Sequence, residues 1–584
     1  MKTSIFLLLI LLHALFHAQT NVSGNVSGTW TVANSPYLVT NNIGVPAGQT
    51  LVIQPGVQVV FQGFYRFGIT GQLVAEGTSA LPITFCHQDT TGWWNDQQMA
   101  GGWRGLYFAP LATTDSSRLV HCVVKDVKHG LNGNANGYAS LYVYGRGLTV
   151  RQCEFTHNQS KASASEGKII VSAPSNGQAL TLEGCFIHHN RVRVSVLFNT
   201  GSAWVQENEF ANNIGGSTVW SLGGGLHFYY NNVHDNQSIY DMTALRVDGG
   251  YNWIKNNRIH HNEADREAAV FCTMGKTVIE SNLICNNYTL NGNCGATDGG
   301  GGIHLSHNNN GVWDSTFYTV RNNVIANNHC AFNGGGIYVY DCKASITNNH
   351  IIHNTAQWGG GAIYAIGNQT RLRIQNNLIH ENDYSQFHST YQLQFNGSDS
   401  IYLDYNWIDE DVAHSVLMNP VVQYLGDTTH NLNGTNPFLI NPTSMIGLAE
   451  DALNKNFNLS PQSIELINMG SVLNGNPSAV DYMGLNRVVG PIDIGAFEAS
   501  FGGLDKLQDA VYLYPNPVAE VLSIEGLDPA DVTYRVLSLT GRVWGSGVLE
   551  SPEISMKDLP SGVYILEINR IFNQEKSTLK FIKL

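Results

Sequence analysis

The chain has 584 residues, which is too long for one compact core and predicts several domains or a repeat array. Only 13% of the residues are charged, against about 25% in typical globular domains. Because 43% are hydrophobic and 60 are Gly, we expect an ordered, turn-rich protein. Lys and Arg total 31 against 45 Asp and Glu, which implies no basic surface for nucleic acid and no nucleic-acid partner.

Residues 1–18 are typical of a secretory signal peptide. A Lys at position 2 precedes an apolar run from Ile5 to Leu12, which is too short to span a bilayer. Later segments do not approach 18 consecutive apolar residues. We therefore expect export through the periplasm and no transmembrane span in the mature chain.

An asparagine-rich heptad recurs along the middle of the chain. It reads "NNRIHHN" (256–262), "SNLICNN" (281–287), "NNVIANN" (322–328), "NNHIIHN" (348–354) and "NNLIHEN" (376–382). The aligned Asn residues are Asn208, Asn231, Asn257, Asn282, Asn323, Asn349 and Asn377, spaced 23 to 41 residues apart. A period in this range predicts a solenoid.

Gly runs followed by short alternating segments, such as "GGGLHF" (223–228) and "GGGIYV" (334–339), predict strands separated by sharp turns. Together with the period they predict an all-β fold, a right-handed parallel β-helix over residues 19–500, with opening coils at 19–110. Its coils would stack about 4.8 Å apart, so the aligned asparagines would form a structural hydrogen-bonded ladder. A leucine-rich repeat is excluded because L-x-x-L-x-L is missing before the Asn.

Three segments carry a resemblance to a known family. Residues 30–85, "GGWRGLYF" (101–108) and "VDYMGLNRVVGPIDIGAFE" (480–498) resemble secreted bacterial β-helix proteins of the pectate-lyase-like superfamily. The resemblance implies the β-helix fold and activities that include polysaccharide lyases, other carbohydrate-active proteins and surface proteins. Segment 480–498 resembles the motif that closes such helices, where we expect Asp481, Arg487, Asp493 and Glu498 to plug the last coil.

Residues 505–584 differ in composition and read as short strands between turns, which predicts a small β-sandwich. Tyr514-Pro515-Asn516-Pro517 and the ending "LKFIKL" closely resemble the C-terminal sorting domain of the type IX secretion system of Bacteroidota. The resemblance implies that the type IX machinery is a partner and that the protein is secreted or held at the outer-membrane surface.

The cysteines and histidines predict little chemistry. Cys294 and Cys330 fall in matching turns of successive coils, which allows a disulfide. The His pairs at 188–189 and 260–261 come with neither an H-E-x-x-H motif nor a recurrent carboxylate, so we expect no metal site there. Calcium stays open as a cofactor, because backbone carbonyls and Asp side chains bind it without a sequence motif.

Strand alternation predicts one outward face that binds glycan. Its residues are His227, Tyr229, Arg246, His304, Tyr338, Tyr340 and Tyr364. Aromatic and polar side chains suit sugar rings, and Arg246 with Asp248 could supply a base and a calcium ligand of a polysaccharide lyase. An inverting hydrolase would need two carboxylates, which do not recur on neighbouring coils. The sequence predicts contact with extracellular polysaccharide and leaves catalysis open; the alternative is a structural surface protein or adhesin.

Overall fold

The structure is a computed structural model of the whole chain. It describes residues 19–584 apart from 96, 111–116, 130–138, 161–166, 174–178, 200, 239–243, 267–268, 291–298, 308–315, 385–390, 398–399, 410–415, 419–421, 426–427, 473–477, 488–490, 500–511, 516–517, 526–531, 539–541, 550 and 571–575. The predicted signal peptide, 1–18, thus lies outside the described residues. Among the described residues, helices long and apolar enough to cross a membrane are absent.

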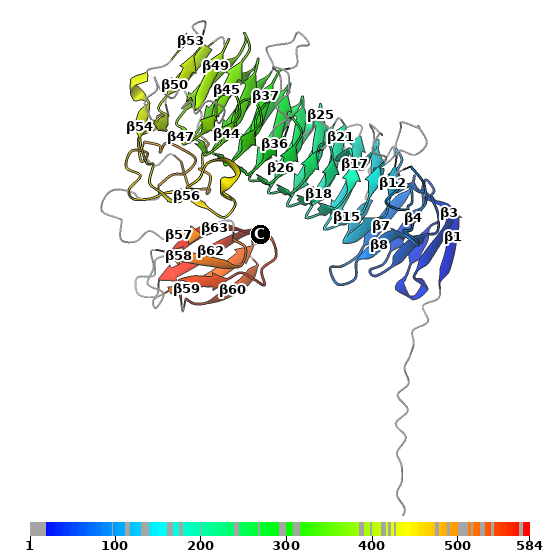
Figure 1. The fold of residues 1–584 in the computed structure, drawn as a ribbon. Helices are drawn as coiled ribbons and strands as arrows, with labels where there is room; N and C mark the ends of the chain where they lie inside the picture. Colours follow the sequence, from blue (N-terminus) through cyan, green and yellow to red (C-terminus); the bar gives the residue numbers. More distant parts are fainter. Residues whose placement is uncertain are drawn as a thin grey trace, which may run out of the picture.

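Short parallel strands stack in columns to form a β-helix, which confirms the predicted fold (Figure 1). The first column, sheet 1, has 15 strands from β2 (Gly28–Trp30) to β53 (Gln423–Tyr424). Its strands that carry the sites described below are β14 (Leu148–Arg151), β22 (Ser202–Gln206), β26 (Gly225–Tyr229), β30 (Tyr251–Lys255), β34 (Lys276–Glu280), β38 (Phe317–Arg321), β42 (Lys343–Thr347), β46 (Arg371–Gln375) and β50 (Ser400–Asp404).

Two further columns diverge from β3 (Tyr37–Val45), whose first half pairs with β5 (Gln58–Phe61) and second half with β6 (Phe67–Ile69). Sheet 2 continues from β5 to β54 (Leu432–Gly434), mostly in three-residue strands. These include β15 (Glu154–Thr156), β19 (Phe186–His188), β23 (Glu209–Ala211), β27 (Asn232–His234), β31 (Arg258–His260), β35 (Leu283–Cys285), β39 (Val324–Ala326), β43 (His350–Ile352), β47 (Leu378–His380) and β51 (Trp407–Asp409).

Sheet 3 continues from β6 to β52 (Val416–Met418). It includes β25 (Val219–Leu222), β29 (Leu245–Asp248), β33 (Val270–Thr273), β37 (Ile303–Ser306), β41 (Ile337–Tyr340), β45 (Ile363–Ile366) and β49 (Leu393–Asn396). A fourth sheet of ten two-residue strands runs from β12 (Lys128–His129) to β48 (Asp383–Tyr384). Inward side chains of the coils form one apolar core that extends from Trp30 to Val416.

The turns on either side of sheet 2 each hold a column of stacked asparagines. The first ladder contains Asn208, Asn231, Asn257, Asn282, Asn323, Asn349, Asn377 and Asn406, and the second contains Asn158, Asn190, Asn213, Asn236, Asn262, Asn287, Asn328, Asn354 and Asn382. Within each ladder the amide Nδ2 donates to Oδ1 of the next coil, as from Asn257 to Asn282 at 2.9 Å. The sequence predicted only the first ladder.

Cys153 and Cys185 extend the first ladder toward the N-terminus. The backbone N–H of Cys153 lies 3.4 Å from Sγ of Cys185, and the N–H of Cys185 donates to Asn208 Oδ1 at 2.8 Å. The residue before each ladder position adopts a left-handed backbone conformation, as in Asn348 (φ 54°) and His353 (φ 56°). Asn and Asp tolerate this conformation because their short polar side chains hydrogen-bond locally.

The described residues of 435–499, the cover segment, lie against the outer face of sheet 2 rather than over the end of the last coil. They contain η3 (Gly447–Ala449), β55 (Leu439–Asn441) and β56 (Asn456–Leu459). A second apolar core forms where Leu283, Val324, Leu378 and Trp407 of sheet 2 meet the cover segment, whose Phe497 is 4% exposed. Five left-handed corner asparagines donate to its backbone carbonyls: Asn286, Asn322, Asn327, Asn348 and Asn376.

The prediction that the closing motif plugs the last coil is therefore wrong about its position. Arg487 donates from Nη1 to Glu498 Oε1 at 2.7 Å and from Nη2 to the carbonyl of Ala496 at 2.8 Å. The backbone N–H of Ala496 donates to Nδ1 of His350, on sheet 2, at 2.7 Å. The motif fastens the cover segment to the side of the coils, because outward apolar residues on sheet 2 need a partner there.

The C-terminal strands form a separate antiparallel body with its own core, as predicted for a small β-sandwich. One sheet contains β57 (Tyr512–Tyr514), β58 (Val521–Glu525) and β61 (Glu553–Ser555). The other contains β59 (Val532–Ser538), β60 (Val543–Val548), β62 (Gly562–Arg570) and β63 (Lys576–Lys583). Apolar residues of both sheets, including Leu522 and Phe581, pack together.

Candidate functional site

A groove of about 510 Å³ lies on the outer face of sheet 1, across its last coils. Strands β38, β42, β46 and β50 supply most of its lining. Strand alternation brings the outward residues into rows: Lys343 pairs with Arg371, and Ser345 with Arg373 and then Tyr402. The register of the strands thus brings the lining residues together on the outer face, while their inward neighbours, such as Ile346 and Ile374, are fully buried in the core.

The groove is basic although the chain carries a net charge of −14. Arg321, Lys343, Arg371 and Arg373 line it, and none of the described lining residues has a carboxylate. Arg321 is engaged outside it by Glu280, whose Oε1 lies 3.1 Å from Nε of Arg321. Lys343, Arg371 and Arg373 lie on the neighbouring strands β42 and β46.

Aromatic rings accompany these cations. The guanidinium carbon of Arg373 lies 4.5 Å from the ring centroid of Tyr402, a cation–π contact that holds the guanidinium over the ring. The Tyr402 hydroxyl donates to Asp404 Oδ2 at 2.7 Å, and this hydrogen bond holds the ring in place. Phe317, which is 44% exposed, lines the groove as well.

The same outward row of sheet 1 continues N-terminally into stacked aromatic rings. Trp204 pairs with His227, and His227 with Trp253. The His227 ring lies 3.8 Å from Trp204 and 4.8 Å from Trp253, nearly parallel to both. Because the stacked rings cover each other's faces, His227 presents only its edge, where Nδ1 lies 3.0 Å from the Tyr229 hydroxyl.

The predicted glycan-binding face is divided between two sheets. His227 and Tyr229 belong to β26 of sheet 1, whereas Arg246 belongs to β29 of sheet 3. The other four predicted residues, His304, Tyr338, Tyr340 and Tyr364, also lie in sheet 3. The prediction of one face was wrong because Gly runs precede strands of both sheets. The distance in sequence to the next ladder Asn distinguishes the two sheets. Phe228 of sheet 1 is three residues before Asn231, whereas Val339 of sheet 3 is ten residues before Asn349.

Arg246 is engaged within the protein. Its Nε lies 3.1 Å from each Asp248 carboxylate oxygen, and its guanidinium carbon lies 4.9 Å from the Trp220 ring and 4.8 Å from the Phe271 ring. The Trp220 Nε1–H donates to Asp248 Oδ2 at 2.9 Å. Burial raises the pKa of Asp248, although Arg246 opposes this. To act as a lyase base and a calcium ligand, Arg246 and Asp248 would both have to leave these contacts.

Three residues predicted to face solvent are buried, which corrects that part of the prediction. His304 is 1%, Tyr338 0% and Tyr364 7% exposed. The chain at Gly299 lies over this part of sheet 3, because His304 Nδ1 is 3.0 Å from the Gly299 carbonyl oxygen. Burial lowers the pKa of His304 to about 3, so it is neutral at physiological pH. Tyr340 is only half-buried.

Cys330 is a buried free thiol, which does not support the predicted disulfide. Its Sγ lies 3.7 Å from the Thr289 hydroxyl and 3.4 Å from the Phe332 backbone N–H. Cys294 lies outside the described residues.

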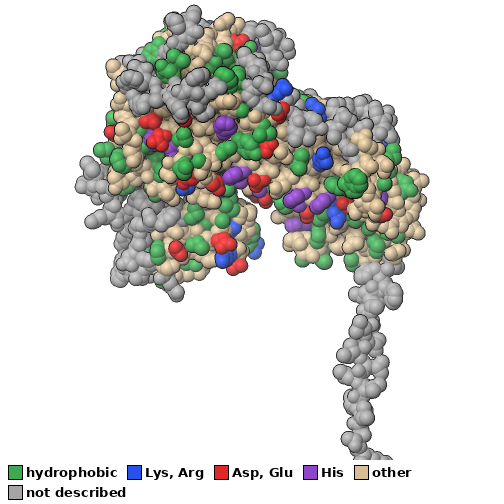
Figure 2. Space-filling view, in the orientation of Figure 1, with side chains coloured by type: hydrophobic (Ala, Val, Ile, Leu, Met, Phe, Trp, Pro, Cys, Tyr) green, Lys and Arg blue, Asp and Glu red, His purple; other side chains and the backbone are tan. Residues whose placement is uncertain are grey.

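Histidines of sheet 2 pair with carboxylates across coils, a pattern that the sequence did not reveal. His188 Nε2 lies 3.0 Å from Glu154 Oε1, and His234 Nε2 lies 3.1 Å from Glu209 Oε1. In both, the first residue of one strand meets the last residue of the next strand in the column. Figure 2 shows histidine and acidic side chains beside one another on this part of the surface. The partners are one coil apart, so they are not neighbours in sequence.

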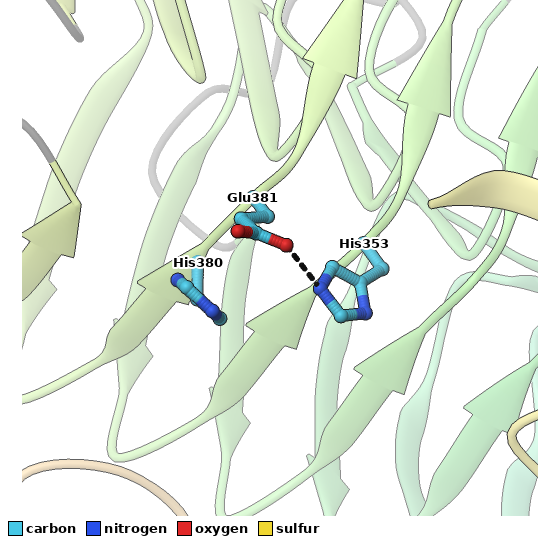
Figure 3. A group of neighbouring side chains, drawn as sticks. All are labelled: His353, His380 and Glu381. Carbon is cyan, nitrogen blue, oxygen red and sulfur yellow. Dashed lines mark hydrogen bonds and ion pairs between the residues drawn. The ribbon is translucent and has the colours of Figure 1, made fainter. Parts of the chain in front are cut away.

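One such group brings three potential ligands together at the edge of the cover segment (Figure 3). It contains His353, His380 and Glu381, with one ligand atom of each within 4.8 Å of the others. His353 and His380 are buried, and the Glu381 side chain is 51% exposed. His353 Nε2 lies 2.9 Å from Glu381 Oε2.

The sequence contains a pattern that indicates the groove. The segments "KASIT" (343–347) and "RLRIQ" (371–375) alternate basic or polar with small or apolar residues just before the heptads. The glycan-binding face was predicted from strands that follow Gly runs, and most of these strands belong to sheet 3. The pattern that indicates the groove is a set of cations at outward positions on neighbouring strands of one sheet.

Comparison with known proteins identifies the C-terminal region. Residues 512–583 match the family of secretion system C-terminal sorting domains, which confirms the predicted type IX sorting domain. Among curated proteins, no match is found. A solved structure with some similarity is PorZ, an essential bacterial surface component of the type-IX secretion system of Porphyromonas gingivalis. It is 21% identical with a TM-score of 0.13, covering 14% of this chain and 13% of PorZ.

Proposed function

We propose that this secreted or cell-surface protein binds an acidic extracellular polysaccharide in the groove of sheet 1. The proposed location rests on the sorting domain, because such a domain directs a protein to the cell surface or the medium. We also propose that the protein crosses the periplasm on its way to the surface. The observation that carries the ligand class is a groove lined by four cations, without a described carboxylate, on a chain of net charge −14.

The geometry of the groove suits a repeating anion. Lys343 and Arg371 lie on neighbouring strands, which are about 4.8 Å apart. Arg373 can bind a carboxylate through two parallel N–H groups, which Lys cannot do. Phe317 and Tyr402 supply apolar surface for the faces of sugar rings. Uronic acid chains combine both chemical features.

Binding is favoured over cleavage at this place. Hydrolysis of a glycosidic bond usually requires two carboxyl groups that flank it, and the described lining residues of the groove provide none. The resemblance to pectate-lyase-like proteins keeps a lyase as the enzymatic alternative, with Arg371 or Arg373 as the base. Formation of unsaturated products from a uronate polymer would support that alternative.

The test compares polygalacturonate with neutral dextran by isothermal titration. We expect binding of polygalacturonate only, weakened by salt because exposed charges are screened. Loss of a charged hydrogen bond costs about 1.5–3 kcal/mol, so Arg373→Ala should weaken binding roughly tenfold or more. Arg151→Ala is the matched control, since Arg151 lies on sheet 1 in an exposed ion pair with Glu183. Equal affinity of the Arg373→Ala and wild-type proteins would contradict the proposal.

A structural or adhesive role is the second candidate, favoured by the two continuous ladders. They extend through successive coils with amide contacts of 2.9–3.1 Å, which makes the β-helix suitable as a rigid spacer. A spacer would not depend on the cations of the groove, so the same Arg373→Ala protein separates the two functions.

A further inference from the structure

The hydrogen bonds around His353 fix which of its ring nitrogens carries a proton. Asn327 Nδ2 donates to the carbonyls of Met445 and Gly447, both at 2.8 Å, so its Oδ1 is an acceptor. The Thr443 hydroxyl therefore donates its single proton to Asn327 Oδ1 at 2.9 Å. His353 Nδ1, 2.6 Å from that hydroxyl oxygen, must then be the donor to it.

Neutral His353 consequently directs a bare nitrogen lone pair at a carboxylate. Its Nε2 lies 2.9 Å from Glu381 Oε2, and two acceptors this close repel one another. A cation between or beside them removes the repulsion, either as a second proton on the imidazole or as a metal ion.

His380 offers a further nitrogen beside the pair. It is 9% exposed, and its Nδ1 has no hydrogen-bond partner in the described part of the chain. The carboxylate of Asp409 is also close, with Oδ2 3.6 Å from this Nδ1. Asp409 Oδ2 also accepts the backbone N–H of Glu381 at 2.8 Å, which holds both carboxylates close to the histidines.

We propose that His353, His380 and Glu381 bind a divalent transition-metal ion, with Zn²⁺ as the best fit, and that Asp409 is within reach as a fourth ligand. Two imidazoles with carboxylate oxygen suit zinc, whereas Ca²⁺ and Mg²⁺ prefer oxygen ligands alone. Tetrahedral zinc places its ligand atoms about 3.3–3.5 Å apart. The exposed Glu381 side chain must turn to close the site, which its exposure allows.

The position of the site gives the ion a structural task. His353 follows β43 and His380 ends β47, whereas Thr443, which orients His353, belongs to the cover segment. The His353 carbonyl also accepts the N–H of Gly447. A bound ion would hold the coil corners in the arrangement that the cover segment requires, so binding should stabilise the fold.

The experiment uses the mature full-length protein, stripped of metal with a chelator and titrated with zinc chloride. We expect one Zn²⁺ per chain with micromolar or tighter affinity, a higher Tm on addition of zinc, and no effect of an equal concentration of Ca²⁺. Glu381→Gln changes an exposed side chain and should fold normally. Its affinity for zinc should fall at least about tenfold, because even outer-shell changes cost 10–100-fold. His380→Gln should have the same effect.

His234→Gln is the matched control. His234 also contacts two carboxylates, but through opposite ring nitrogens: Nε2 faces Glu209 and Nδ1 faces Asp235. These carboxylates cannot converge with one nitrogen on a single ion, so the variant should bind zinc like the wild type. Absence of zinc binding would overturn the proposal. Undiminished binding in Glu381→Gln and His380→Gln would overturn it as well.

Discussion

Asn349 illustrates what a single ladder residue contributes. It is fully buried, and its Nδ2 donates to the carbonyls of Val320 and Thr347 and to Asn377 Oδ1, at 2.9–3.1 Å. Its Oδ1 accepts the N–H and the Nδ2 of Asn323 at 2.9 and 3.0 Å. One side chain thus satisfies polar groups on three successive coils.

Replacement of Asn349 by Leu should destabilise the protein by about 1–3 kcal/mol, because buried donors and acceptors lose their partners. Urea unfolding followed by circular dichroism measures the change. Asn368→Leu is the control, since Asn368 is exposed in a turn and should change stability by less than about 0.5 kcal/mol. A neutral Asn349→Leu substitution would mean that the ladder does not stabilise the coils.

At this scale the sequence predicted inward residues better than outward ones. Leu226, Val247 and Leu305 are fully buried in the core, as alternation indicates. Alternation also predicted that His304 and Tyr338 would be exposed, and both are buried. The period of a strand determines on which side of the sheet a residue lies. It does not determine whether another segment of chain covers that side.

The cover segment lies at a different place from the one predicted from sequence. Its closing motif was recognised, but contact with the side of the coils depends on residues far away in sequence, such as Asn376 with Ser471. The signal was the outward apolar residues of sheet 2, Leu283, Val324 and Leu378, inside the same heptads that showed the ladder. The groove of sheet 1 was missed for a similar reason, because its cations come from separate repeats.

Three carboxyl groups surround one arginine in the cover segment, which predicts a pH effect on this element. Burial raises the pKa of Glu498 to about 8 and that of Asp481 to about 6, despite the nearby Arg487. Asp493 shifts in the same direction for the same reason. The folded protein therefore holds protons that the unfolded chain has lost, so stability falls as pH rises from about 5 to about 8.

We expect hydrogen exchange of residues 478–499 to become faster across that pH range, beyond the intrinsic effect of base, relative to amides in sheet 1. Glu498→Gln removes the group with the highest pKa and should flatten the dependence. An unchanged pH dependence in this variant would show that Glu498 is not the titrating group.

For the whole molecule, the sorting domain and the β-helix are separate bodies with separate cores. Deletion of residues 505–584 should leave the β-helix folded but keep it in the periplasm, because the domain acts as an export signal. Cell fractionation with an antibody to the β-helix checks the location, and circular dichroism checks the fold. Surface delivery of the truncated protein would refute this role.

The attachment of the cover segment has a consequence for how this protein can change in length. Each coil contacts chiefly its neighbours, so duplication of a coil between β15 and β27 would extend the rod and leave the cover segment untouched. Duplication between β35 and β51 would instead displace Asn322, Asn348 and Asn376 by one step from the carbonyls to which they donate. Gain and loss of repeats during evolution should therefore be confined to the N-terminal half of the rod.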